Sequence, residues 1–486
     1  MKTILFFLKK YLTLIFLLST IIVFSQNYKP TWESLDQRPM PEWFPQAKFG
    51  IFIHWGVYSV PAWRKLEEGR YASYAEWYYA RVMDNKANGG YEFHRANYGK
   101  GFEYRDFAPF FKAELFNPDQ WAQLFKKSGA KYVVLTSKHH DGYCLWPTEN
   151  KHKVNWNSGD IGPKRDLLGE LSKSVKKQGL KMGLYYSIPD WESIPKKSDG
   201  SEYYIRKEFV DKYGLSPEKY RDEIAIPQLF ELVNKYQPSL IFSDAGEWIY
   251  NDEFWKTKEF LSWLYNESPS KDDVVVNDRF CKGMPANHGD YFSSEYKDAD
   301  ESKLNKYWEE SRGIGGSYGF NRAENLEDYS SSKDLIIELV DIVSRGGNLL
   351  LNVGPTADGR IPVIMQERLL DIGAWLDVNG EAIYETIPYD FKKMKSGDKE
   401  VYFSSKKKQL FAFFSDWQEE LVLELVEDDV VKNVSLLGYD GKIKWEMNQE
   451  NQLIITIPIL TITQIPCQHV WVFKIDKTKY YAEGHL

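Results

Sequence analysis

The chain has 486 residues, too many for one small hydrophobic core, so we expect a large domain and a smaller one. Lys and Arg total 62 against 70 Asp and Glu, and no basic block is long enough to follow a phosphate backbone, which argues against a nucleic-acid partner. Aromatic residues make up 16% of the chain, with 17 Trp. Flat rings of this kind stack on the C–H faces of sugars, although they also fill large cores.

The N-terminus has the pattern of an export signal. Lys2, Lys9 and Lys10 precede an apolar run over 11–18, and the apolar character ends near Ser25. We therefore expect residues 1–25 to be a signal peptide, with no stable membrane insertion after cleavage and a periplasmic or secreted protein, lysosomal in a eukaryotic source. An uncleaved anchor is the alternative, because the run is nearly long enough to span a bilayer.

From about residue 45 to 385, short apolar runs alternate with amphipathic stretches, the rhythm of βα units around a parallel sheet. Helices are expected over 118–128, 167–178, 226–235 and 333–344, and Asn117 is a good cap for a helix that opens with Pro118. Strands are expected over 49–54, 132–137, 181–186, 239–243, 274–277, 291–295 and 349–353. These seven strands favour an α/β fold, a (β/α)8-like (TIM) barrel over residues 26–389 with one strand missed or distorted.

The pattern changes after residue 384. Short alternating runs such as 401–403, 410–414, 421–425 and 453–457 are separated by polar turns, and no helical pattern intervenes. We therefore expect a C-terminal antiparallel β-sandwich over residues 390–486.

Asp244 is the first candidate for chemistry. The apolar run 239–243 delivers this carboxylate to a turn where Gly246 and Trp248 follow closely, which is how a barrel enzyme presents a catalytic group. A carboxylate at this place can attack the anomeric carbon of a sugar or ligate a metal. An aspartate that only caps the next helix is the competing interpretation.

A second carboxyl group must then lie close to Asp244 in space. Glu295 closes the expected strand 291–295, which puts it on the catalytic rim. Glu309 is expected in a loop beside Trp308, whose apolar face can raise a carboxyl pKa toward that of a proton donor. We favour Glu295 and keep Glu309 as the second choice, against the alternative that each is a solvated glutamate.

Two other strand ends supply candidate substrate-binding residues: His54 with Trp55, and the pair His139-His140. Neutral imidazoles can bond sugar hydroxyls, and a metal site is the sharper rival. That rival lacks a helical i, i+4 histidine pair and a cysteine cluster. A pocket wall is completed by a set of aromatic and charged residues: Glu76, Trp77, Tyr185, Trp248 and Arg279.

A glycine-rich run covers 312–321 and could suggest a phosphate-binding loop. It lacks the Lys-Ser/Thr of a P-loop, and no clear strand leads into it. We interpret it as a flexible active-site loop.

Taken together, several segments resemble the α-L-fucosidases of glycoside hydrolase family 29. The motifs that carry the resemblance are PEWF at 41–44, AKFGIFIHWG at 47–56, KHHDG at 138–142, SDAGEW at 243–248 and GGNLLLNVGP at 346–355. Several long matches in the same order are highly specific, and they cover nearly the whole mature chain.

The resemblance implies a (β/α)8-like barrel followed by a β-sandwich, with Asp244 as the nucleophile. It implies fucose contacts at His54, Glu76, Trp77, His139, His140, Tyr185 and Arg279, and it keeps Trp308, Glu309 and Ser311 among the site residues. It does not decide between Glu295 and Glu309 as the acid/base. Ala245 is a departure, because many members run directly from Asp to Gly.

The expected function is therefore the retaining, exo-acting hydrolysis of terminal α-L-fucose from glycoconjugates or oligosaccharides, without a cofactor. The expected partner is a fucosylated glycan, and assembly into a homo-oligomer is left open. Two alternatives stand beside it: a non-catalytic fucose-binding protein, and a metal-dependent hydrolase that uses His54, His139, His140 and Asp244.

Overall fold

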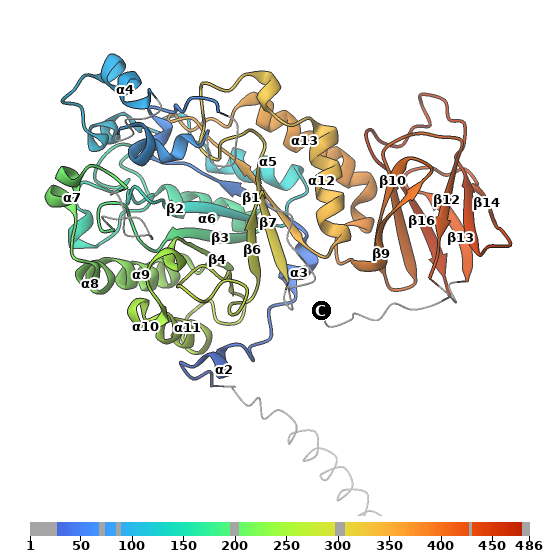
Figure 1. Cartoon of the computed structure of the whole chain (residues 1–486), viewed down its shortest axis with the longest axis horizontal. Coiled ribbons are helices and arrows are strands. Elements are labelled where there is room, and N and C mark those ends of the chain that lie inside the picture. Colours follow the sequence, from blue (N-terminus) through green and yellow to red (C-terminus); the bar gives the residue numbers. More distant parts are fainter. Residues whose placement is uncertain are drawn as a thin grey trace, which may run out of the picture.

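A computed structural model describes residues 27–67, 73–83, 89–194, 204–296, 307–426 and 430–478. A larger α/β part and a smaller all-β part lie side by side, with helices α12 (Ser332–Ser344) and α13 (Val363–Asn379) between them (Figure 1). The predicted export signal, residues 1–25, lies outside the described residues. Within the described ranges, none of the helices combines the length and apolar character that a membrane crossing requires.

The larger part contains one sheet of eight parallel strands in the order β5-β4-β3-β2-β1-β8-β7-β6. The strands are β1 (Phe49–Ile53), β2 (Tyr132–Lys138), β3 (Lys181–Ser187), β4 (Leu240–Asp244), β5 (Val275–Val276), β6 (Phe292–Glu295), β7 (Trp308–Gly313) and β8 (Asn348–Val353). The seven predicted strands are confirmed. The missed strand is β7, because its sequence, WEESRG, carries charges where a buried strand is usually apolar.

The sheet curls into a TIM-like barrel whose two edge strands are β5 and β6. The backbone N–H of Asp290, just before β6, donates to the carbonyl of Val276 in β5 at 3.0 Å. The Asp290 side chain accepts from the backbone N–H of Val276 at 2.8 Å. Two hydrogen bonds, one through a side chain and one between backbone groups, therefore join the edge strand β5 to the segment before β6, where the regular strand pairing ends.

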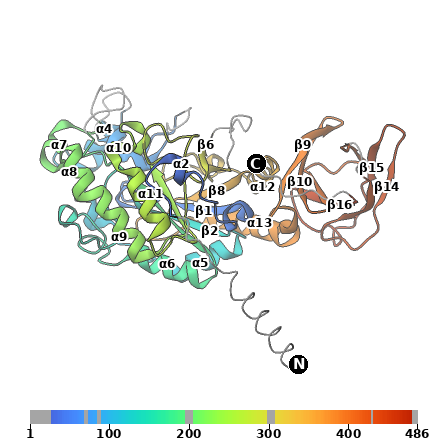
Figure 2. The same ribbon diagram turned by 90° about the horizontal axis from the view of Figure 1, so that it is seen from below.

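Helices lie on the outer side of this sheet, among them α5, α6, α9 and α13 (Figure 2). Those of the α/β part, besides α12 and α13, are α2 (Trp32–Leu35), α3 (Trp43–Ala47), α4 (Gly90–Tyr98), α5 (Pro118–Lys127), α6 (Leu167–Lys177), α7 (Lys207–Tyr213), α8 (Pro217–Tyr220), α9 (Ile226–Tyr236), α10 (Asp252–Trp255) and α11 (Thr257–Asn266). The predicted cap of α5 is confirmed, since the Asn117 side chain accepts from the backbone N–H of Gln120 at 3.1 Å.

The smaller part is the predicted antiparallel sandwich, and its first strand begins at Ile387. A five-stranded sheet has the order β13-β16-β11-β10-β9 and faces a three-stranded sheet with the order β12-β15-β14. The strands are β9 (Ile387–Ser396), β10 (Lys399–Lys406), β11 (Gln409–Phe414), β12 (Glu420–Glu424), β13 (Val431–Leu436), β14 (Lys444–Met447), β15 (Gln452–Thr456) and β16 (Trp471–Lys477).

Strand β11 explains why its sequence is apolar without interruption. Leu410 and Phe414 point into the core between the two sheets, whereas Phe411 and Phe413 point to the other face and join the core of the α/β part. Trp375 of α13 also donates its indole N–H to the carbonyl of Val470 at 2.7 Å. The sandwich is therefore packed onto the barrel through a shared apolar layer.

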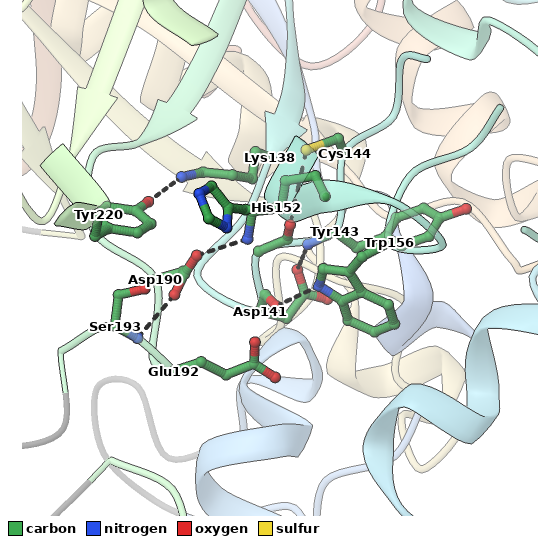
Figure 3. A network of polar contacts seen from close by, with 12 residues as sticks. Lys138, Asp141, Tyr143, Cys144, His152, Trp156, Asp190, Glu192, Ser193 and Tyr220 are labelled. Carbon is green, nitrogen blue, oxygen red and sulfur yellow. Dashed lines mark hydrogen bonds and ion pairs between the residues drawn. The ribbon is translucent and has the colours of Figure 1, made fainter. Parts of the chain in front are cut away.

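A buried polar network lies under the loops that follow β2 and β3, at the carboxyl end of the sheet (Figure 3). The Asp190 carboxylate accepts from Lys153 Nζ at 2.9 Å and from the backbone N–H of Ser193 at 3.0 Å. Lys138 Nζ, at the end of β2, donates to the Tyr220 hydroxyl, which in turn donates to a backbone carbonyl. The network thus joins the end of β2 to the loop after β3 and to α8.

The residues after β2 are fixed by the same network. Asp141 accepts from the backbone N–H of Tyr143 through its side chain and from the indole N–H of Trp156 through its carbonyl, each at 3.1 Å. The backbone N–H of Trp191 donates to the carbonyl of His140 at 2.9 Å. The two loops therefore hold each other, and the His139-His140 segment has a fixed backbone.

The Asp190–Lys153 pair should contribute strongly to stability. Burial opposes ionisation of Asp190, but the ammonium groups of Lys153 and Lys138 lower the pKa of its carboxyl to about 2. Replacement by Asn leaves Lys153 buried without a counter-charge, and we expect Asp190→Asn to lower the free energy of unfolding at pH 7 by about 3 to 5 kcal/mol in a urea titration.

The control is Asp211→Asn, which removes the partner of Lys207 in an exposed pair and should change stability by less than about 1 kcal/mol. Because the folded-state pKa of Asp190 is depressed, its stabilisation is present above about pH 4 and is lost as the pH falls toward 2. Equal effects of the two variants at pH 7 would contradict this account of the network.

Candidate active site

A cavity of about 480 Å³ lies at the carboxyl ends of the parallel strands. Ten of the residues predicted from the sequence line it: His54, Glu76, Trp77, His139, His140, Tyr185, Asp244, Trp248, Arg279 and Glu295. They come from the carboxyl ends of six strands, β1 to β6, and from two short turns in the connecting segments. Residues far apart in the chain converge here because parallel strands end at one edge.

Asp244 is the last residue of β4 and is buried, with 8% of its surface exposed. Its Oδ2 accepts from the Tyr185 hydroxyl at 2.7 Å, and its Oδ1 accepts from the backbone N–H of Ala245 at 2.9 Å. Ala245 has a φ of 63°, in the left-handed region that a non-glycine residue rarely occupies. This strained backbone turns the N–H of Ala245 back onto the carboxylate, which fixes its orientation.

Arg279 joins Asp244 to Glu295. Its Nη1 donates to Glu295 Oε1 at 2.5 Å and lies 3.4 Å from Asp244 Oδ1. Because both oxygens contact the same nitrogen at 2.5 and 3.4 Å, they lie less than about 6 Å apart. The structure therefore holds two carboxyl groups as a close pair in one cavity.

The guanidinium of Arg279 is itself fixed. Its Nε donates to the Ser293 hydroxyl at 2.8 Å, and that hydroxyl donates to the Asp278 carboxylate at 2.9 Å. Burial opposes the charge of Arg279, but the carboxylates of Glu295 and Asp244 hold its pKa well above the ordinary value. Arg279 is therefore a permanent cation that lowers the repulsion between the two acids.

His140 presents a hydrogen-bond acceptor to the cavity. The Ser187 hydroxyl donates its single hydrogen to the carbonyl of Pro189 at 2.5 Å, so it must accept from His140 Nδ1, at 2.6 Å. Burial lowers the pKa of His140 to about 3, so the ring is neutral and its Nε2 carries no proton. That Nε2 lies 3.4 Å from Asp244 Oδ2, where it can accept the hydrogen of a hydroxyl group.

His54 is fixed in the same tautomer. The side-chain amide of Asn352 donates through Nδ2 to the carbonyl of Tyr318 at 2.7 Å, which turns its oxygen toward His54 Nδ1, also at 2.7 Å. Nδ1 therefore carries the proton. Burial lowers the pKa of His54 to about 4, so its Nε2 is likewise an acceptor.

Aromatic rings and one further acid form the wall beside these histidines. Trp77 lies against His140, Trp191 and Trp248, with ring centroids 5.6, 5.3 and 6.1 Å away. Burial raises the pKa of the neighbouring Glu76 to about 7. The cavity thus combines flat apolar surface with a few directional polar groups, the usual composition of a small-molecule site.

Four residues predicted for the site do not line the cavity: Trp55, Trp308, Ser311 and Glu309. Trp55 is buried among aromatic side chains, and its indole N–H donates to the carbonyl of Thr356 at 2.9 Å. The Trp308 indole N–H lies 3.4 Å from the carbonyl of Arg345. Ser311 contacts the Tyr318 hydroxyl at 2.7 Å, behind the wall to which Tyr318 belongs.

Glu309 lies at the opposite end of the sheet. The prediction that it sits in a loop is wrong, because it belongs to β7, is fully buried and pairs with the first residue of β8. Its carboxyl group accepts from the hydroxyl of Tyr132, the first residue of β2. Burial raises the pKa of Glu309 to about 8. The amino-terminal ends of these strands thus keep Glu309 away from the cavity.

Several lining residues were missed by the sequence analysis, among them Phe52, Glu247, Asp278, Ser293 and Tyr318. Glu247 and Asp278 directly adjoin predicted site residues, so the strand-end signal could have included them. Burial and the Asp244 carboxylate raise the pKa of Glu247 well above its ordinary value. Tyr318 lies in the glycine-rich run, whose sequence gives no sign of where it folds.

The alternative hypothesis, that the site binds a metal ion, can be checked against the same side-chain geometry. Within the residues that the structure describes, no group of three or more His, Cys, Asp or Glu side chains is arranged to hold a metal ion. His54 Nδ1 and His140 Nδ1 are instead used in hydrogen bonds to Asn352 and Ser187.

Comparison with known proteins extends over both parts of the fold. A family model described as Alpha-L-fucosidase matches residues 15–381, and one described as Alpha-L-fucosidase C-terminal domain matches residues 395–476. Tissue alpha-L-fucosidase from Homo sapiens is 41% identical over 457 residues, covering 93% of this chain and 93% of that protein. Alpha-L-fucosidase from Branchiostoma floridae is 41% identical over 458 residues, covering 93% of this chain and 96% of that protein.

Solved structures agree with the sequence matches. Thermotoga maritima alpha-fucosidase in complex with a mechanism based inhibitor superposes with a TM-score of 0.79 at 38% identity, covering 92% of this chain and 100% of that chain. The same enzyme in complex with fucose gives a TM-score of 0.78 at 38% identity, with the same coverage of the two chains. From its sequence, its fold and its C-terminal domain, the chain belongs to the α-L-fucosidase family.

Proposed function

We propose that this chain is an exo-acting α-L-fucosidase that removes terminal α-L-fucose from fucosylated glycans with retention of configuration. The observation that carries the mechanism is the simultaneous contact of Arg279 with Asp244 and Glu295. Carboxyl groups about 5 to 5.5 Å apart suit a retaining mechanism, whereas an inverting one needs about 6.5 to 9.5 Å to admit a water molecule. A separation below about 6 Å favours retention.

In the first step, an oxygen of Asp244 attacks C1 of the fucosyl group. The bond from C1 to the leaving oxygen breaks, and Glu295 gives its proton to that oxygen. The bonds from Tyr185 and from the backbone of Ala245 hold the Asp244 carboxylate in place for this attack. The product is an ester between Asp244 and the sugar.

In the second step, the Glu295 carboxylate takes a proton from a water molecule, and the water oxygen attacks C1. The bond from C1 to Asp244 breaks, and the aspartate leaves as a carboxylate. Arg279 supports this step because its guanidinium contacts both Glu295, which acts as the base, and Asp244, on which the negative charge departs.

Sugar recognition follows from the fixed tautomers. The Nε2 atoms of His54 and His140 are acceptors, so they suit two sugar hydroxyl groups as donors. Trp77 offers an aromatic face for the C–H side of the ring. A cavity of about 480 Å³ suits a single terminal sugar and not the interior of a chain.

We also propose that the chain is exported. The basic and apolar pattern of residues 1–25 supports an export signal, which would deliver the enzyme to the periplasm or the medium.

Replacement of the nucleophile should stop turnover. We expect Asp244→Gly to lower kcat for an aryl α-L-fucoside by at least about 10⁴-fold, because no covalent intermediate can form. Azide fits the space left by the side chain and should then yield the β-L-fucosyl azide, with inverted configuration. A variant with near-normal kcat would contradict the role of Asp244.

Variants of the two candidate acids, Glu295 and Glu309, should differ clearly in activity and in their rescue by azide. We expect Glu295→Gly to lower kcat/KM by about 10² to 10⁴-fold, and azide to restore turnover with release of the α-L-fucosyl azide, with retained configuration. Glu309→Gln should keep kcat/KM within about threefold, because its side chain lies at the other end of the sheet and is already neutral below its raised pKa. Azide rescue of a Glu309→Gly variant, with none for Glu295→Gly, would reverse the assignment.

A further inference from the structure

The glycine-rich run between β7 and α12 lies between the carboxyl groups of Glu76, which is buried, and Glu324, which is partly buried. Glu76 contacts it from the connection between β1 and β2, and Glu324 contacts it from the segment that follows the run. Glu76 and Tyr318 line the cavity, whereas Ser317 and Glu324 do not. The expectation of a flexible loop therefore needs revision, since hydrogen bonds hold this run on both sides.

Ser317 is the residue that joins the run to Glu76. It is buried, and its hydroxyl donates to Glu76 Oε2 at 3.1 Å while accepting from the backbone N–H of Ala75 at 2.9 Å. The backbone N–H of Gly319 donates to the same Oε2 at 2.8 Å. Both donors use one oxygen of Glu76, so the orientation of its carboxyl group is fixed, and Glu76 lines the cavity.

Glu324 fixes Ser317 from the other side. Its Oε1 accepts from the backbone N–H of Ser317 at 2.9 Å. A Cβ atom on Gly315 would lie 2.8 Å from Glu324 Oε2, and one on Gly319 would lie 3.1 Å from Glu76 Cβ. A side chain at either glycine would therefore crowd one of the two acids.

The Glu76 side chain depends on these donors because it is almost completely buried. Burial disfavours its ionised form, and the hydrogen bonds from Gly319 and Ser317 oppose that effect. A carboxylate that binds a sugar hydroxyl must be both ionised and correctly turned. Loss of the Ser317 hydroxyl would weaken both properties without changing any group that touches the sugar.

We propose that Ser317 and Glu324 are positioning residues that orient Glu76 for the substrate: Ser317 through its hydroxyl, and Glu324 by fixing the peptide of Ser317. This inference rests on the proposed function, in which Glu76 contacts the fucosyl group. The same hydrogen bonds hold Tyr318 in place, since it lies between Ser317 and Gly319. Its ring is 4.7 Å from that of His54.

A double-mutant cycle tests the proposal, with kcat/KM measured on an aryl α-L-fucoside for the wild type, Ser317→Ala, Glu76→Ala and the double variant. We expect Ser317→Ala to lower kcat/KM about tenfold in the wild-type background, the size of one hydrogen bond to a charged group. In the Glu76→Ala background the same change should have less than about a twofold effect. Thermal unfolding checks that the variants remain folded.

Two results would overturn the positioning role: an equal loss in both backgrounds, or no loss from Ser317→Ala in the wild type. A wild type that hydrolyses the fucoside, combined with a fully active Glu76→Ala, would also overturn it by removing the group through which Ser317 acts. Failure of the proposed function would look different, because the wild type itself would then release no fucose.

Variants of Glu324 provide a second test. Glu324→Leu removes the acceptor for Ser317 and should lower kcat/KM about tenfold, whereas Glu324→Gln keeps an acceptor oxygen and should stay within about threefold of the wild type. Glu327→Leu, at an exposed position of the same segment, is the matched control and should leave kcat/KM unchanged. Equal activity of Glu324→Leu and Glu327→Leu would contradict the role of Glu324.

Discussion

Arg279 holds the carboxyl groups of Asp244 and Glu295 together in one buried cavity, and the arrangement of the site follows from that interaction. Two like charges this close would repel each other strongly in a place of low polarity. The guanidinium offsets that repulsion because it is always charged and offers several donors in a fixed plane. Ser293 and Asp278 fix the guanidinium in turn. The spacing of the two acids is thus a property of the strand ends and not of mobile side chains.

Around this pair, several polar groups are fixed by a partner behind them. Asn352 and Ser187 determine which nitrogen of His54 and His140 carries the proton, and the backbone N–H of Ala245 orients the Asp244 carboxylate. The loop that carries His139 and His140 is held by a buried ion pair between Asp190 and Lys153. Such preorganisation lets a site meet the charges of a reaction without rearranging. The polar groups of the site are therefore held in place by the rest of the fold before a substrate binds.

Much of the barrel and most of the cavity could be predicted from the sequence, because an expected strand that ends on an acidic residue or a histidine is a local signal. Asp244, the His139-His140 pair and Glu295 were found in this way. Strand β7 was not, because its buried residues include two acids: Glu309, whose partner Tyr132 comes from the distant β2, and Glu310, which pairs with Arg312 of the same strand. The same error placed Glu309 in a loop. The closing of the glycine-rich run on Glu76 is likewise a long-range contact that no local pattern contains.

The central claim is that Asp244 becomes covalently bonded to the sugar during turnover. Trapping with a fluorinated fucosyl fluoride, which slows the second step, followed by peptide mass mapping, tests this claim most directly. The account predicts one fucosyl label per chain on Asp244, with loss of activity in proportion to labelling. A label on Glu295, Glu247 or any other residue, or inactivation without a label, would contradict it.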